Sequence, residues 1–322
     1  MKEENKYFIY DSPSKNNIKR LIKKTINGIQ AFFDKCILNL FVPKRKNTPK
    51  FDVAVCTIFK NEAKYLKEWI EFHKIVGVQH FYLYNNNSTD DYTSVLDPYI
   101  KSGLVSLIQW EKNYAQMEAY QDCVAKFSNE TKWLGFIDVD EYIVPNKHDN
   151  VYDFLKAFEK NRPAVVVYWK MFGTSGLLER AENGLVLEDF TVCWRKFTDI
   201  GKCFYNTKYK IDVSEKNNYM HHRLWTKIGC LHIPPVNEFD RIVIGDRNKA
   251  KGSYFPIQIN HYFTKSYKEY QEKKSKGDVY FKLNPHDEEY FYMHEKKCAD
   301  TDFSGYKYLI KLKQAMRVKD NG

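Results

Sequence analysis

The sequence lacks several features that would place it in a common protein class. None of its seven cysteines forms a CxxC pair, so a zinc site built on paired cysteines is not expected. Their number is odd, and several lie in apolar stretches such as Val55-Cys56-Thr57. This usage is typical of reduced, buried thiols in a cytoplasmic protein.

Glycine-rich phosphate loops and long apolar runs are also missing. The 14 glycines are scattered and form neither a GK[ST] P-loop nor a GxGxxG dinucleotide fingerprint. No stretch approaches roughly 18 uninterrupted apolar residues, so no transmembrane helix is expected. The first residues, Met1-Lys2-Glu3-Glu4-Asn5, are not followed by the apolar core of a signal peptide. We therefore expect a cytoplasmic location.

Positive charge is present but unevenly distributed. Residues 1–50 carry 12 Lys and Arg against 4 Asp and Glu, so they hold +8 of the net charge of +10. The rest of the chain is close to neutral, which argues against a basic groove for nucleic acid across the main body. With 322 residues and 43% hydrophobic content, the chain can bury a large core, and one large α/β domain with appendages is expected.

The N-terminal segment predicts a basic amphipathic helix over residues 17–41. Apolar side chains recur at three- and four-residue spacings from Ile18 to Leu40, with lysines such as Lys19 and Lys23 between them. Two interpretations stay open. The helix packs on the domain with its charges in water, or it attaches peripherally to the anionic inner face of the cell membrane.

Strands and helices alternate after Phe51, which predicts a parallel sheet with right-handed crossovers. The expected domain division is an N-terminal appendage at 1–50, a main domain at 51–280 and a C-terminal helical extension at 281–322. Short strands are expected between 185 and 233. The other predicted strands are 51–59, 80–84, 105–110, 133–137 and 164–170, and the helices are 61–76, 115–127, 151–159, 265–276 and 306–318.

The most informative stretch is the apolar run from Trp133 to Ile137, which ends in Asp138-Val139-Asp140-Glu141. The run is typical of a buried central strand. Ligands of open α/β sheets bind at the carboxyl ends of such strands. Paired carboxylates there suit a hard divalent cation that holds substrate phosphates. The alternative is that both aspartates are only turn formers.

Three polar loops leave the same predicted edge of the sheet. They are Thr57 to Glu62, Tyr84 to Asp91, and Asp138 to Glu141. In a parallel sheet such loops meet on one side, so their Asn, Ser and Asp side chains can converge on a base or ribose. For the Asn-rich loop, a helix cap and turn is the competing explanation.

These loops carry a resemblance to a known family. Residues 60–73, KNEAKYLKEWIEFH, resemble the signature of the DUF23-type glycosyltransferases, that is glycosyltransferase family 92 and its bacterial family-2-like relatives. Residues 84–90 are similar to the second block, with Asn85 where an Asp is usual. Residues 116–123, 138–142, 260–266 and 272–278 match the later blocks.

The resemblance implies a GT-A fold with a mainly parallel central sheet, and a nucleoside diphosphate-sugar donor, with UDP-sugars favoured. It also implies Mn²⁺ or Mg²⁺ at the DxD motif. The expected metal ligands are Asp138, Asp140 and His261. The donor-binding candidates are Thr57, Asn61, Glu62, Asn87, Asp90, Gln116 and Asp138.

The family also implies inversion at the anomeric carbon, which requires a carboxylate base for the acceptor hydroxyl. Four carboxylates follow the DxD strand, Glu179, Glu182, Glu188 and Asp189, and we select Glu182 and Asp189 as candidates. Lys208 and Lys210 could reach phosphate, although solvated strand charges are the alternative. The family match at His221, His222 and His232 is loose.

The sequence therefore predicts a metal-dependent, inverting glycosyltransferase that acts on a glycan or lipid-linked acceptor in bacterial surface polysaccharide synthesis. Two alternatives remain. A haloacid dehalogenase-like phosphohydrolase would also end a strand in Asp-x-Asp, with Asp138 as nucleophile, but Tyr142 stands where Thr or Val normally follows. A non-enzymatic adaptor would bind membrane or nucleic acid through residues 1–50.

Overall fold

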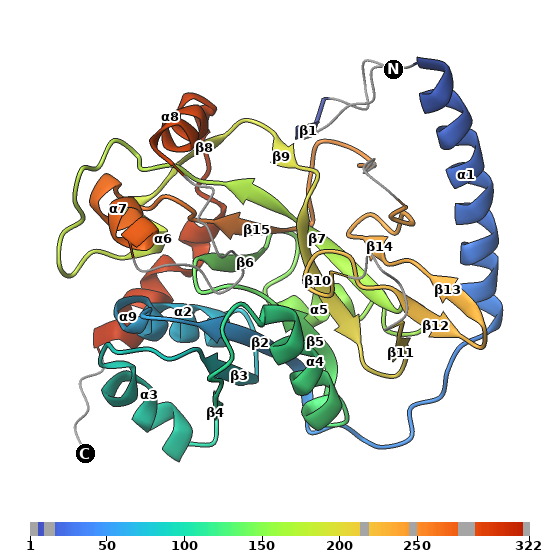
Figure 1. The fold of residues 1–322 in the computed structure, drawn as a ribbon, viewed down its shortest axis with the longest axis horizontal. Coiled ribbons are helices and arrows are strands. Elements are labelled where there is room, and N and C mark those ends of the chain that lie inside the picture. The colour runs from blue at the N-terminus through green and yellow to red at the C-terminus, as the bar shows by residue number, and fades with distance from the viewer. Residues whose placement is uncertain (1–5, 10–16, 213–218, 245–249, 276–286, 318–322) are drawn as a thin grey trace.

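The fold is built on one large mixed sheet, whose strands lie in the central part of Figure 1. The computed structural model describes residues 6–9, 17–212, 219–244, 250–275 and 287–317. The strand order is β4-β3-β2-β5-β10-β7-β15-β6, with β14 beside β7. These strands are β2 (Phe51–Phe59), β3 (His80–Asn85), β4 (Val105–Gln109), β5 (Thr131–Phe136), β6 (Glu141–Pro145), β7 (Ala164–Met171), β10 (Gly201–Asn206), β14 (Val236–Asn237) and β15 (Ile257–His261).

Strand direction explains how the sheet can build a site at one edge. Strands β4, β3, β2 and β5 are parallel neighbours, and β7 is parallel to β14 and β15. Strand β10 runs antiparallel to both β5 and β7, and β6 runs antiparallel to β15. The ends of the forward strands therefore share an edge with the beginnings of β10 and β6. The predicted fold class, an α/β fold with a mainly parallel sheet flanked by helices, is confirmed.

Both faces of the sheet are covered, so the central strands are apolar on both sides. In β2, Val53 and Val55 belong to one core while Ala54 and Cys56 belong to the other, as expected from side chains that alternate along a strand. The first core contains residues of α2 (Ala63–Ile75), α3 (Tyr92–Lys101) and α9 (Leu309–Arg317). The second contains residues of α4 (Gln116–Phe127).

Most predicted elements are present, with changes at their ends. Helix α5 covers only Val151–Leu155, because the chain then continues in tighter turns, as in the bond from Phe158 N to Leu155 O. The segment 185–233 contains a short helix besides strands: α6 (Val186–Asp189), β8 (Val192–Trp194), β9 (Phe197–Thr198), β11 (Lys210–Ile211), β12 (Thr226–Ile228) and β13 (Leu231–Ile233). Helix α7 covers Tyr267–Ser275. Gly277 and Asp278 of the last family block lie outside the described residues.

The segments that the sequence sets apart from the main domain pack against it. Strand β1 (Phe8–Ile9) pairs with β9 in the main domain. Beyond α8 (Glu288–Lys296), which the sequence analysis did not predict, β16 (Cys298–Thr301) pairs with β8. The short helix η1 (Ser304–Tyr308) leads into α9, whose Leu309 and Leu312 are buried in the first core.

Helix α1 (Asn17–Leu40) stands at the periphery, at the right of Figure 1. Its last turns touch the body through Leu38, which is buried in the second core. None of the helices in the described part of the chain is both long enough and apolar enough to span a bilayer.

Candidate active site

Charged side chains gather at the edge where forward strands end and reverse strands begin. Asp138 follows β5, Glu141 opens β6, and His261 closes β15. Phe204 of β10 pairs with Gly135 of β5, and the two strands are antiparallel. Lys202, two residues before Phe204, therefore lies beside the end of β5. This topology brings together residues from three separate parts of the chain.

Asp138 is paired with a buried cation. The Nζ atom of Lys202 lies 2.6 Å from Oδ2 of Asp138 and 3.5 Å from Oε2 of Glu141. The Lys202 side chain is completely buried. Burial alone lowers the pKa of this lysine, but the carboxylates of Asp138 and Glu141 outweigh that effect and raise the pKa. Lys202 is therefore a permanent positive charge inside the site.

Asp140 has a different cation. Its Oδ2 atom lies 2.6 Å from Nζ of Lys273 on α7, and its Oδ1 atom lies 3.6 Å from Nε2 of His261. Burial opposes ionisation of this carboxyl group, but Lys273 and His261 hold the pKa of Asp140 well below its usual range. Asp140 is therefore ionised.

Asp140, Glu141 and His261 offer a possible metal site. One ligand atom from each lies within 4.8 Å of the others, and all three residues are buried. Burial lowers the pKa of His261, so its imidazole is neutral, which is the form that binds metals. Glu141 Oε1 and His261 Nδ1 have no hydrogen-bond partner among the described residues. Two carboxylates and one imidazole fit a divalent cation such as Mn²⁺.

This group differs from the predicted ligand set in one member. Asp140 and His261 are in it, but Asp138 is not, and Glu141 takes its place. The Oδ2 atom of Asp138 faces Lys202, and its Oδ1 atom accepts weak hydrogen bonds from Gln116 Nε2 at 3.4 Å and Tyr120 Oη at 3.3 Å. Gln116, predicted to bind the donor, thus orients Asp138 in this structure.

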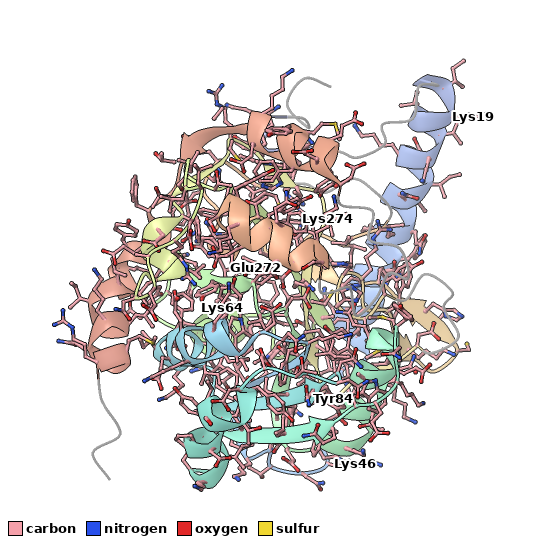
Figure 2. The ribbon with its side chains drawn as sticks, turned by 60° about the vertical axis from the view of Figure 1, so that its left-hand side comes forward. Lys19, Lys46, Lys64, Tyr84, Glu272 and Lys274 are labelled. Carbon is pink, nitrogen blue, oxygen red and sulfur yellow. The ribbon has the colours of Figure 1, made fainter. Side chains whose placement is uncertain are left out.

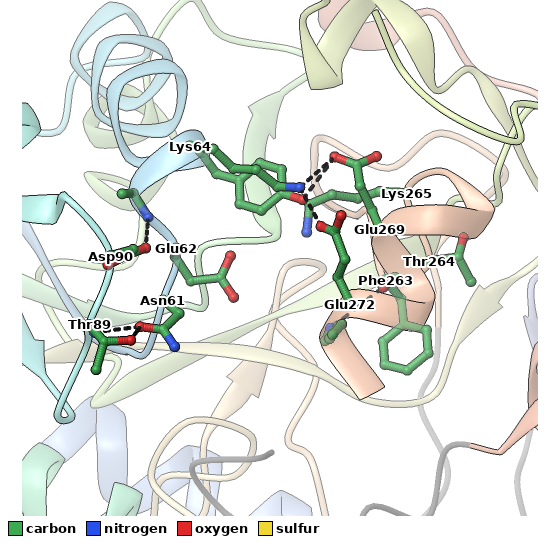
Figure 3. A pocket seen from close by; sticks show the side chains of 13 residues that line it. Asn61, Glu62, Lys64, Thr89, Asp90, Phe263, Thr264, Lys265, Glu269 and Glu272 are labelled. Carbon is green, nitrogen blue, oxygen red and sulfur yellow. Dashed lines mark hydrogen bonds and ion pairs between the residues drawn. The ribbon is translucent and has the colours of Figure 1, made fainter. Parts of the chain in front are cut away.

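A cavity of about 390 Å³ lies beside this cluster (Figure 3). One wall contains three predicted donor-binding residues, Asn61, Glu62 and Asp90. The opposite wall comes from the last family block and includes Lys273, which also contacts Asp140. The cavity therefore lies directly next to the acidic pair. Its other lining residues are Ala63, Lys64, Tyr65, Thr89, Phe263, Thr264, Lys265, Glu269 and Glu272.

The first two loops hold one another in place, as the dashed lines in Figure 3 show. Asp90 Oδ2 accepts a 2.7 Å hydrogen bond from Ala63 N at the start of α2. Asn61 Oδ1 accepts a 2.7 Å bond from Thr89 N. Asn61 has a φ of 54°, a left-handed conformation that Asn tolerates better than most residues. The convergence predicted for these two loops is confirmed.

Four predicted donor-binding residues do not line this cavity: Gln116 and Asp138, described above, and Thr57 and Asn87. Thr57 is fully buried, and its hydroxyl donates a 2.7 Å bond to Ile137 O. In this structure Thr57 ties β2 to the segment after β5, and its donor-binding role stays a prediction. Asn87 is exposed and donates to Glu111 O at 3.0 Å.

A second cavity of about 750 Å³ shares Lys64, Glu269 and Glu272 with the first. Glu182 is among its lining residues, together with Glu179 and Glu188. The lining also includes the cations Arg180, Lys268, Lys313 and Arg317. Charged groups of both signs thus surround a space adjoining the first cavity.

Asp189, the other predicted base, lines neither cavity. It closes α6, and burial raises the pKa of its carboxyl group. Among the described residues, neither Glu182 nor Asp189 forms a hydrogen bond or ion pair with Asp138 or Asp140. The structure therefore places Asn61, Glu62 and Asp90 around one cavity, Asp140 and His261 in one cluster beside it, and Glu182 at the neighbouring cavity.

The histidines and lysines considered in the sequence have mixed positions. Lys208 donates to Lys160 O and Lys210 is exposed on β11, so neither is the lysine beside Asp138. His222 packs on Trp169, which in turn packs on His261, with ring centroids 5.0 and 4.6 Å apart. His232 instead pairs with Asp212.

Sequence reasoning missed Glu141, Lys202 and Lys273 as parts of the site. The signal for Lys202 was its position as a lone charge in an apolar stretch, Gly201-Lys202-Cys203-Phe204-Tyr205. A charged residue inside a buried strand needs a partner of opposite charge. Lys273 lies in the last family block but carried no local clue to its partner.

Several curated plant proteins resemble this chain. A glycosyltransferase family 92 protein of Ricinus communis is 37% identical over 106 residues, which are 33% of this chain and 18% of that protein. A galactan beta-1,4-galactosyltransferase of Arabidopsis thaliana is 31% identical over 116 residues, covering 32% of this chain and 23% of that protein. The chain thus spans less than a third of these relatives' lengths.

Solved structures also overlap with part of the fold. TarS of S. aureus, residues 1–349, aligns with a TM-score of 0.34 and 15% identity over 49% of this chain and 47% of TarS. Glucosyl-3-phosphoglycerate synthase from Mycobacterium tuberculosis, in complex with Mn²⁺ and UDP, aligns with a TM-score of 0.27 and 15% identity, over 37% of this chain and 44% of that one.

A family model gives the assignment. The model of glycosyltransferase family 92 matches residues 50–229. This span runs from the start of β2 through β12, so it includes Asp138, Asp140, Glu141 and Lys202. It covers more than half of the chain and the first four blocks of the resemblance. The chain therefore belongs to glycosyltransferase family 92.

Proposed function

We propose that this chain transfers a sugar from a nucleoside diphosphate-sugar, with UDP-sugars favoured, to a glycan or lipid-linked acceptor. The observation that carries the proposal is the 390 Å³ cavity, which joins the loop residues Asn61 and Asp90 to Lys273, the lysine paired with Asp140. Family membership supports the same reaction class.

In this proposal the two loops after β2 and β3 bind the nucleoside. Asn61, Glu62 and Asp90 line the cavity with amide and carboxylate groups, which can bond to the base and ribose hydroxyls. Their mutual hydrogen bonds hold the loops before the donor arrives, which reduces the ordering cost of binding.

Asp140, Glu141 and His261 would hold the divalent cation, with Mn²⁺ or Mg²⁺ as candidates. When bound, such a cation supplies positive charge to a leaving diphosphate. The protein adds charge of its own. Lys273 borders the cavity and Lys202 is fixed beside Asp138, so both ammonium groups can offset negative charge that develops on the diphosphate.

We assign the second cavity to the acceptor because it adjoins the first through Lys64, Glu269 and Glu272. Inversion would be a single displacement. The acceptor oxygen bonds to the anomeric carbon as the bond to the diphosphate breaks, and a carboxylate takes the hydroxyl proton. Glu182 is the candidate base that lines this cavity, and Asp189 is the second candidate.

The cellular setting is a further part of the proposal. We propose a cytoplasmic enzyme, peripheral on the inner face of the cell membrane, that contributes to a bacterial surface polysaccharide. The basic segment before residue 51 supports this setting. The curated relatives described above are plant proteins.

Family membership weakens both alternatives. A haloacid dehalogenase-like phosphohydrolase would form an aspartyl-phosphate on Asp138, which family 92 does not predict. A pure adaptor would not need an acidic cluster beside a cavity. Mass spectrometry of the protein after incubation with a phosphoryl donor would detect the aspartyl-phosphate.

Thermal unfolding with nucleoside diphosphates and Mn²⁺ tests the proposal. A ligand at about 100 times its dissociation constant stabilises the native state by about 2.7 kcal/mol. We expect UDP with Mn²⁺ to raise the melting temperature, and Asp140→Asn to abolish that rise. Asp97→Asn is the matched control, because Asp97 is a half-exposed carboxylate on α3. If no common nucleoside diphosphate shifts the transition with Mn²⁺ present, the donor site is wrong.

A further inference from the structure

Helix α1 is amphipathic, but its polar side faces the protein. Asn27, Asp34 and Leu38 are spaced by seven and four residues, so they share one side of the helix. Asn27 Nδ2 donates to Ile244 O at 3.3 Å, and Asp34 and Leu38 are buried. A helix that packs on a core normally turns its apolar side inward, and α1 does so only near its C-terminal end, at Ile37 and Leu38.

The opposite side of α1 is apolar and faces away from the body. Ile22, Ile29, Phe33 and Leu40 have the spacings of seven, four and seven residues that align side chains on a helix. They are 54%, 56%, 59% and 76% exposed. Further large apolar residues flank them, namely Leu21, Ile26 and Phe32, each more than half exposed. We call these seven residues the outer face. A continuous apolar face of this kind marks an interaction site.

Polar contacts fix this orientation of the helix. Lys35 Nζ lies 2.8 Å from Oδ2 of Asp240, and Asn39 Oδ1 accepts bonds from Asn161 and Arg162. Figure 2 shows α1 at the edge of the molecule, with Lys19 near its free end. The helix is therefore held by its polar side, and its outer face is presented outward.

Charge identifies the partner. Lys19, Lys23 and Lys24 are exposed near the start of α1, whose first turn has no acidic residue. Residues 1–50 as a whole carry 12 basic and 4 acidic residues. Two copies of this chain, packed face to face, would bring two such basic segments together, and that contact is repulsive. An anionic lipid bilayer has an apolar interior and negative head groups, so it complements both the apolar outer face and the basic residues of α1.

We propose that α1 is a membrane-docking helix that lays its outer face into the interface of an anionic bilayer. The lysines contact the head groups while the isoleucines and phenylalanines enter the acyl boundary. This inference does not depend on the proposed sugar transfer, because it concerns a surface remote in sequence from the acidic cluster.

Vesicle co-sedimentation of the full chain tests the proposal. We expect binding to vesicles that contain phosphatidylglycerol, and much weaker binding to pure phosphatidylcholine or at high salt, which screens the lysines. Ile29→Ser with Phe33→Ser should lower the partition coefficient at least about tenfold. The matched control is Leu178→Ser with Ile310→Ser, which removes two exposed apolar side chains elsewhere, 76% and 68% exposed.

The outcomes are distinguishable. Selective loss in the α1 double variant, with an unchanged melting temperature and an unchanged response to UDP and Mn²⁺, supports membrane docking. Equal binding by both double variants overturns it, as does the absence of wild-type binding to anionic vesicles. The alternative partner of the outer face is a second copy of this chain, and sedimentation velocity tests for it. A wild-type dimer that becomes monomeric in the double variant Ile29→Ser with Phe33→Ser would make the outer face a dimer interface. That result would also overturn the proposal.

Discussion

The two aspartates of the acidic pair lie one residue apart, yet their cations come from different layers of the molecule. The lysine beside Asp138 is Lys202, on a central strand and fully buried. The lysine beside Asp140 is Lys273, on a surface helix, with 28% of its side chain exposed. Both Nζ to Oδ2 distances are 2.6 Å, so distance alone does not distinguish the two pairs.

Burial and connection to the cavity distinguish them. A buried ammonium group between two carboxylates cannot leave without exposing uncompensated charge, so the pair of Lys202 and Asp138 is part of the framework. Lys273 borders the cavity, and its flexible side chain can turn from Asp140 toward another anion. One lysine is fixed and the other is exchangeable, and each property can be tested separately.

The largest effect is expected from Lys202→Met. Removing this buried charge leaves Asp138 and Glu141 without their cation, so the free energy of unfolding should fall by about 3–5 kcal/mol. Urea denaturation measures the change. Lys210→Met, at an exposed position on β11, is the control and should change stability by less than about 0.5 kcal/mol. Equal effects in the two variants would remove the distinction between fixed and exchangeable lysines.

Glu68 is a useful contrast to Asp138 and Asp140, because it is a buried carboxylate held mainly by backbone N–H groups and not by a lysine. Val186 N and Leu187 N donate to its two oxygens at 2.9 and 3.1 Å. Burial raises the pKa of Glu68 from 4.5 to about 7. The folded state therefore binds this proton more tightly than the unfolded state. The stability contribution is fully present below pH 4.5, and it is lost as the pH rises through about 7.

The expected loss over this pH window is about 3 kcal/mol, since one pKa unit corresponds to roughly 1.4 kcal/mol. Glu68→Gln should remove most of this slope in urea denaturation curves measured between the two pH values. Glu272→Gln, at an exposed position on α7, should leave it unchanged. A slope that persists in Glu68→Gln would assign the pH dependence to other buried acids.

The affinity for Mn²⁺ should distinguish Asp138 from the possible metal ligands Asp140, Glu141 and His261. Removal of an outer-shell partner of a metal ligand typically weakens metal binding roughly 10- to 100-fold, so we expect a loss of Mn²⁺ affinity at least that large in His261→Gln. Asp138→Asn should lose less, because Asp138 lies outside the group of three. Isothermal titration with Mn²⁺ on the chelator-treated protein measures both. A larger loss of Mn²⁺ affinity in Asp138→Asn than in His261→Gln would mean that Asp138 is a metal ligand.

The smallest effect is expected from Lys273→Met. We expect the loss of stability to be smaller than in Lys202→Met, since 28% of the Lys273 side chain is exposed and Asp140 keeps His261 as a neighbour. UDP affinity in the presence of Mn²⁺ should fall about three- to tenfold, because the cavity loses a charge that can meet a phosphate. Lys274→Met removes the next lysine on the same helix, which is exposed, and should leave affinity unchanged. Titration calorimetry with UDP compares the two.

Sequence patterns predicted the first half of the sheet and much of the site. Strong periodicity defined β2, α2 and α4, and parallel topology predicted that loops after β2 and β3 meet. Asp140 and His261 were found as a pair through the family resemblance. Thr57 lies away from the cavity because a residue near the end of a strand can point into the core, as its bond to Ile137 shows.

The parts of the fold and of the site that were not predicted depend on strand pairing between distant segments. Lys202 meets Asp138 only because β10 inserts antiparallel between β5 and β7, and a pattern of local residues does not specify that insertion. The same applies to Glu141, whose role follows from the reversal of β6 against β15. Residues 287–317 were expected as a helical extension, but the pairing of β16 with β8 joins them to the domain.

The insertion of β10 has a consequence for biosynthesis. A nascent chain that has emerged only as far as residue 160 contains all four strands of the parallel half, β4, β3, β2 and β5, and both aspartates. It still lacks the ammonium group of Lys202, and the imidazole of His261 and the ammonium group of Lys273 follow only some sixty to seventy positions after Lys202. Contacts that join such distant segments form late. The charged cluster around Asp138 and Asp140 is therefore completed only after the parallel half of the sheet has been synthesised.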